Sequence, residues 1–189
     1  MKKLAIVFMV MAFGCSANKT FTNSAEKTFF PMEIGEEFTY RYVNSPSFVK
    51  YRDLGLLREF NGKTYHARQN HYSWDKIDTS YFRAENETIY YFDTKSGKES
   101  VQMPGKLKKG YSWTSADEAW SYEITDLDAQ LTTPEQRYSG LLVIKSTQLQ
   151  NRDRTKSPEY LIYYQQNVGK VASVTNGELM TYKVESQYP

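Results

Sequence analysis

Few residues of this chain are spaced for catalysis. His66 and His71 are its only histidines, and they lie five positions apart in a stretch that we expect to be extended. An odd spacing in a strand sends side chains to opposite faces, so we expect no shared metal, and each histidine should lie at the surface or a sheet edge. The chain has no Gly-x-Ser-x-Gly or His-Glu-x-x-His motif. We therefore expect a protein that is not an enzyme and that needs no cofactor or metal.

Two pairs of aspartates are the closest approach to a metal or acid-base site. Asp75 and Asp78 form one pair, and Asp126 and Asp128 form the other. Carboxylates at such spacing could contribute oxygen ligands to Ca²⁺, but each pair lies in a polar segment and is better interpreted as solvated turn residues. Paired carboxylates for glycoside hydrolysis depend on a separation in space that the sequence does not define. A hydrolase is therefore the weakest of three functional hypotheses.

The aromatic residues are the better indication of a binding site. Phe, Trp and Tyr make up 15% of the chain. Where a strand carries rings on both faces and only one face is buried, the rings on the other face stay exposed. Such rings could stack on sugars or line a lipophilic cavity. The alternative is that they form cross-strand pairs and core. The candidate ligand-binding residues are Tyr91, Trp113, Trp120, Tyr163 and Tyr164.

The single cysteine follows an apolar run at the start of the chain. Lys2 and Lys3 precede an apolar segment from Leu4 to Phe13, and Gly14 then leads to Cys15. A positive start, a short apolar core and small residues at the end are typical of a secretory signal. The run has about ten residues, whereas a membrane-spanning helix needs roughly 20. The alternatives are an ordinary cleaved signal beside a coincidental cysteine, or a short buried helix.

This pattern resembles the signal of bacterial lipoproteins. The resemblance implies that residues 1–14 are removed and that Cys15 becomes the acylated first residue, which anchors the protein to a membrane. It also implies, from Ser16 in the second mature position, an outer-membrane location, with the protein facing the periplasm or the cell surface. Residues 15–28 are polar and are expected to form a flexible tether. Removal of two lysines leaves 24 − 2 = 22 basic against 22 acidic residues, so no nucleic-acid partner is expected.

The remaining residues, 29–189, suit a single all-β domain. Period-two alternation, as in Phe38, Tyr40 and Tyr42, indicates half-buried strands, and Asn61-Gly62 is a strong hairpin signal. We predict a curved antiparallel meander that forms a barrel or half-barrel. Residues 126–138 are predicted as a loop or short helix, and Ser115-x-x-Glu118 allows a helical turn. The predicted strands are 37–43, 54–60, 63–73, 80–84, 88–92, 99–103, 111–113, 119–125, 141–150, 158–166, 170–174 and 178–184.

Two segments of the domain echo one another. Gly35-x-x-Phe38 and Gly110-x-x-Trp113 each enter a predicted strand, 110 − 35 = 75 residues apart. The echo indicates either duplicated halves of one sheet or chance reuse of a turn.

A second resemblance rests on four short motifs. They are Pro31 to Phe38, Asn61 to Tyr65, Leu107 to Trp113 and Tyr163 to Val171. Together they resemble a group of small β-rich bacterial lipoproteins of uncharacterised function, which implies a curved antiparallel sheet and no established activity.

These observations favour a lipid-anchored binding or carrier module for an apolar or carbohydrate ligand. The second hypothesis is an accessory lipoprotein that docks an envelope protein. A deep aromatic-lined cavity would favour the carrier, an exposed apolar patch over a filled core would favour docking, and two inward carboxylates in a cleft would favour the hydrolase.

Overall fold

The protein is all-β, as predicted. The computed structural model describes residues 28–149 and 154–184, so the predicted signal peptide, Cys15 and nearly all of the tether lie outside the described residues. No helix among the described residues is long and apolar enough to cross a membrane. The strands are β1 (Glu37–Tyr42), β2 (Phe48–Phe60), β3 (Lys63–Tyr72), β4 (Ile77–Glu85), β5 (Thr88–Asp93), β6 (Lys98–Met103), β7 (Ser112–Thr114), β8 (Trp120–Thr132), β9 (Arg137–Gln148), β10 (Glu159–Gln165), β11 (Gly169–Thr175) and β12 (Glu178–Val184).

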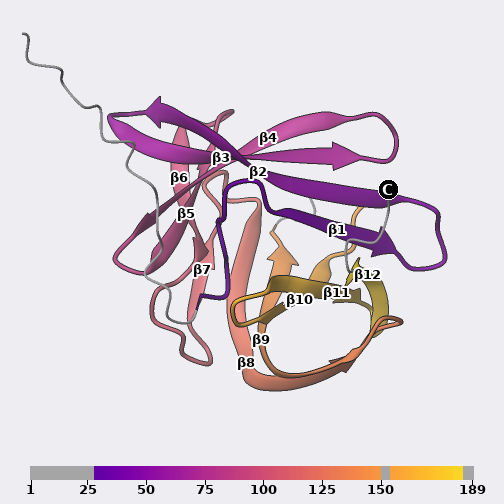
Figure 1. Ribbon diagram of the computed structural model, residues 1–189. Coiled ribbons are helices and arrows are strands. Elements are labelled where there is room, and N and C mark those ends of the chain that lie inside the picture. The colour runs from indigo at the N-terminus through magenta and orange to yellow at the C-terminus, as the bar shows by residue number, and fades with distance from the viewer. Residues whose placement is uncertain (1–27, 150–153, 185–189) are drawn as a thin grey trace, which may run out of the picture.

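The strands form one antiparallel sheet that curls into a nearly closed barrel (Figure 1). Each strand pairs with the next along the chain, except β6 and β7, and β1 pairs with β12. The sheet therefore has one seam, between β6 and β7. Trp113 on β7 bridges it, because its indole N–H donates to the carbonyl of Val101 on β6 at 2.8 Å. The predicted meander and barrel shape are both confirmed.

Turn residues set the connections where the sequence indicates them. Asn61 and Gly62 have φ values of 51° and 72°, and Asn176 and Gly177 have 51° and 79°. Two successive positive φ angles define the type I′ turn that suits a tight hairpin. The Ser115 segment is a turn between β7 and β8 and holds no helix, because the Ser115 hydroxyl accepts the amide of Trp120 at 3.0 Å.

The prediction for residues 126–138 is wrong. Strand β8 runs to Thr132 and β9 begins at Arg137, so this segment is the end of a long hairpin. Its register with β9 shifts three times. These irregularities break the period-two pattern that indicates a strand. Strand β2 begins at Phe48, six residues before the predicted start. The prediction missed these residues because the charged Asp53 is buried in the strand, where a period-two pattern calls for an apolar side chain.

The two halves of the barrel repeat one local structure. The amide of Gly35 donates to the carbonyl of Asp53 at 2.8 Å, and the amide of Gly110 donates to the carbonyl of Ile124 at 2.7 Å. The glycines have φ of 84° and 83°. In each half the acceptor lies on a strand of 13 residues, and the register with the next strand shifts directly after it. This correspondence supports duplication of a six-stranded unit over chance reuse of a turn.

The segment before β1, indigo in Figure 1, packs into the barrel. Phe30 and Met32 are buried in the main hydrophobic cluster, and the Phe30 and Phe82 rings lie 5.0 Å apart. The amide of Asn167 donates to the carbonyl of Thr28 at 2.6 Å. Residues 28–32 thus form part of the wall around the site described next.

Candidate functional site

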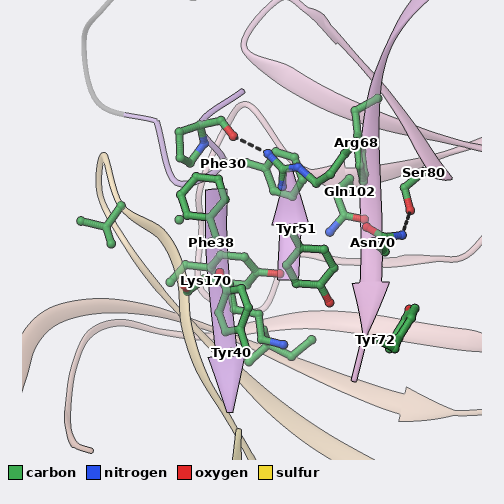
Figure 2. A pocket seen from close by; sticks show the side chains of 16 residues that line it. Phe30, Phe38, Tyr40, Tyr51, Arg68, Asn70, Tyr72, Ser80, Gln102 and Lys170 are labelled. Atoms are coloured by element: carbon green, nitrogen blue, oxygen red, sulfur yellow. Dashed lines mark hydrogen bonds between the residues drawn. The ribbon is translucent and has the colours of Figure 1, made fainter. Parts of the chain in front are cut away.

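The barrel contains a cavity of about 320 Å³ (Figure 2). Its size is at the lower end of the range of small-molecule sites, ~300–1,000 Å³. Seven aromatic rings and five polar or charged side chains, from separate strands and the segment before β1, contribute to its wall. Those rings are Phe30, Phe38, Tyr40, Tyr51, Tyr72, Phe82 and Tyr164, and the polar or charged side chains are Arg68, Asn70, Ser80, Gln102 and Lys170.

Arg68 in the cavity wall is held by the protein through its Nε and Nη2 atoms. Its guanidinium donates to both carboxylate oxygens of Asp53, at 2.6 and 2.7 Å, and to the carbonyl of Pro31 at 2.8 Å. It also lies 4.8 Å from the centre of the Phe30 ring. Burial raises the pKa of Asp53, but side-chain hydrogen bonds and the charge of Arg68 outweigh it and hold the pKa below its usual value. This neutral pair has no net charge to offer a ligand, and it fixes the segment before β1.

Asn70 presents a polar atom without a partner. Its side-chain N–H groups donate to Asp78 Oδ1 at 2.6 Å and Ser80 Oγ at 2.9 Å. Since only the NH₂ group can donate to a carboxylate, these bonds fix the orientation of the amide. The residue is 6% exposed, and its Oδ1 makes no hydrogen bond. A buried unsatisfied oxygen costs about 1–3 kcal/mol, and a ligand donor would remove that cost.

Lys170, on β11, brings a positive charge to the same cavity. Its Nζ lies 5.0 Å from the centre of the Tyr40 ring, and the Tyr40 hydroxyl donates to the Lys170 carbonyl at 2.8 Å. No ion pair or hydrogen bond of its ammonium occurs within the described ranges 28–149 and 154–184. Burial lowers the pKa of Lys170 to about 8. A charged ammonium and seven rings thus surround one space.

In the part of the chain that the structure describes, no three or more histidine, cysteine, aspartate or glutamate side chains are grouped so that they could hold a metal ion. The prediction that His66 lies at the surface or a sheet edge is wrong. The residue is 2% exposed, and its Nε2 lies 3.5 Å from Asp53 Oδ1. It pairs with Leu57 of β2 next to the register shift between Asp53 and Leu57. Asp126 accepts the amide of Asp128 at 3.0 Å on an exposed stretch of β8, and Asp78 bonds Asn70.

The five predicted ligand-binding aromatics lie in four places. Tyr164 lines the cavity. Tyr91 and Trp120 line an adjoining hollow of about 630 Å³, which shares Ser80, Phe82 and Gln102 with the cavity. Trp113 packs on the core, where its ring stacks on Tyr122 at 5.5 Å. Tyr163 packs against a separate cluster of Tyr138, Leu141 and Val171.

Sequence reasoning missed most of the cavity wall. Phe38 and Tyr40 alternate in a predicted strand, which marks one face as buried, but nothing local shows that this face meets Lys170 from β11. The alternation of Arg68, Asn70 and Tyr72 on β3 was the available signal for a second wall. It is a weak signal, because polar residues at every second position are equally typical of a solvated face.

Comparison with protein-family models, curated proteins and solved structures gave no match for this chain. The site is therefore interpreted from its own geometry.

Proposed function

We propose that this protein is a non-enzymatic carrier or binding module that holds a small, largely apolar molecule inside its barrel. The observation that carries the proposal is the cavity of about 320 Å³ with seven aromatic rings in its wall. Apolar walls with a few placed polar groups are typical of small-molecule sites.

An apolar ligand fits this cavity better than a carbohydrate. Sugars present hydroxyl groups on all sides and need several polar partners, whereas buried polar groups without partners are costly. Here two polar side chains, Arg68 and Ser80, already bond within the protein. The lining groups that make no hydrogen bond to another described residue include the Asn70 oxygen and the Lys170 ammonium. A carbohydrate is the alternative ligand that the experiment below would identify by mass.

The proposal includes an anchor at Cys15. The apolar run ending at Gly14 and the unpaired cysteine support removal of residues 1–14 and acylation of Cys15. In this proposal the acyl chains hold the barrel on the outer membrane, facing the periplasm or the cell surface. The polar tether before Thr28 lets the barrel exchange ligand with a partner or with the membrane.

Mass spectrometry of protein purified from the membranes of its own host tests both parts. We expect a denatured mass that begins at Cys15 with acyl chains, and a native mass that is larger by one small molecule. The variant Ser80→Leu, which fills the cavity, should lose the extra mass. Thr79→Leu, at an exposed position on the same strand, should keep it. An acylated protein that never carries a second mass would contradict the carrier proposal, and an unmodified chain that starts elsewhere would contradict the anchor.

A docking role is the second candidate, supported by exposed apolar side chains beside the β2 bulge. Ile34 is 62% exposed and Leu56 56% exposed, and Ile34 Cγ2 would lie 3.5 Å from a Cβ added at Gly55. If these residues bind an envelope protein, Ile34→Ser with Leu56→Ser should abolish its co-purification with the intact barrel. Retained co-purification would contradict this role.

A further inference from the structure

The cavity wall has one charge, on Lys170, that forms no ion pair with any described residue. Lys170 Nζ faces the ring of Tyr40 at 5.0 Å, and no carboxylate lines the cavity. The other lining cation, Arg68, is bidentate to Asp53. The neighbouring Lys183 does not line the cavity, and its Nζ donates to the carbonyl of Val168 at 3.4 Å. Lys170 is half-buried, and an ammonium partly withdrawn from water without an anion is destabilising, so a ligand that supplies an anion binds with that cost relieved.

The positions of the charge and the rings define the shape of such a ligand. Figure 2 shows Lys170 beside Tyr40, while Asn70 and Tyr72 lie across the cavity from them. Rings of Phe38, Tyr51 and other residues line the space between the two sides. An anionic end at Lys170 would therefore leave the rest of the molecule among aromatic carbons.

We propose that the ligand has a single anionic oxygen group, a carboxylate or a phosphate, which pairs with Lys170, and an apolar body that packs on the cavity rings. This inference rests on the proposed carrier function and specifies its ligand class. Hydroxyls of the lining tyrosines can donate secondary hydrogen bonds to the anionic group, and Lys170 makes the selection for charge.

Native mass spectrometry of the mature protein in one non-ionic detergent tests the ligand class. Decanoate, decyl phosphate and decanol share an alkyl chain, and the detergent competes with each of them equally. A hydrogen bond to a charged group contributes about 1.5–3 kcal/mol, so the anions should bind about 10- to 100-fold more tightly than decanol. Tighter binding of decanoate would indicate a fatty-acid type of ligand, and tighter binding of decyl phosphate a phospholipid type.

Variants at Lys170 separate the charge from the cavity. Lys170→Met should reduce the preference for the anions over decanol to about onefold, and Lys170→Gln serves as a second neutral variant. Lys145→Met removes a charge from the outer ion pair with Glu123 and should leave the preference unchanged. An unchanged preference in both Lys170 variants, with binding still lost in Ser80→Leu, would overturn the anion assignment and leave the carrier intact. Absence of binding by all three probes would overturn both proposals.

Discussion

Replacing Lys170 with methionine should stabilise the unliganded protein at neutral pH. Burial lowers the pKa of this lysine from 10.5 to about 8. At ~1.4 kcal/mol for each pH unit, this difference corresponds to roughly 3 kcal/mol that the folded state loses while the lysine is charged. The variant also loses the contact with the Tyr40 ring, which contributes about 0.5–2 kcal/mol. The net expected gain is about 1–2 kcal/mol, or a rise in Tm of about 2–8 °C for a chain of this size.

The dependence of this gain on pH identifies its cause. Below about pH 8, Lys170 is charged in both the folded and the unfolded chain, so the full cost is present. Between about 8 and 10.5 the unfolded chain binds more protons than the folded chain, and the free energy of unfolding of the wild type should rise relative to the variant. At higher pH both states hold a neutral lysine and the variant should lose its advantage.

Urea unfolding of wild type, Lys170→Met and Lys145→Met at pH 7, 9 and 11 measures this difference. Tyrosine ionisation affects all three proteins alike, so only differences between them are compared. The Lys145 variant breaks a half-exposed ion pair, whose Nζ and Glu123 Oε2 lie 3.3 Å apart, and should change stability by less than about 1 kcal/mol. A Lys170→Met protein that is no more stable than wild type at pH 7, with a difference independent of pH, would refute the reasoning.

Two further perturbations test the barrel itself by urea unfolding. Asp53→Ala should destabilise the protein by about 3–5 kcal/mol, because it leaves the buried Arg68 charge unpaired. The free energy of unfolding of the double variant Asp53→Ile with Arg68→Ile should lie within about 2 kcal/mol of wild type. A double variant as unstable as the single one would contradict this. Gly35→Ala and Gly110→Ala should each destabilise the protein by about 1–2 kcal/mol, since φ is 84° and 83° at these positions. Gly55→Ala should be near neutral, because its new Cβ meets only ordinary contacts. Equal effects at all three glycines would contradict the assignment of the cost to φ.

The strands were largely predictable because their signals are local. Alternation such as Phe38, Tyr40 and Tyr42 identifies a strand within seven residues, and Asn61-Gly62 identifies its turn within two. The hairpin end at residues 126–138 was not predictable in this way, because repeated register shifts interrupt its alternation.

The site was less predictable because it depends on which faces meet after the barrel closes. Tyr163 and Tyr164 are adjacent in the sequence, and only the second lines the cavity. A register shift between them, in the pairing of β10 with β11, decides how this stretch meets Lys170. The sequence shows that neighbouring rings point to opposite faces. It does not show which face is enclosed, since that choice is made by pairings 130 residues apart, such as Tyr40 with Lys170.

The two structurally similar halves supply an internal comparison for the polar side of the cavity. Asp53 pairs with Arg68 in the first half, and at the equivalent point of the second half Ile124 pairs with Ile144. Both isoleucines belong to the main hydrophobic cluster, so the unit folds with apolar residues at these positions. A buried ion pair is often no more stabilising than the hydrophobic residues that could replace it. The fold alone therefore does not account for Asp53 and Arg68. Arg68 lies in the cavity wall and donates to the carbonyl of Pro31, which links this ion pair to the site and to the segment before β1.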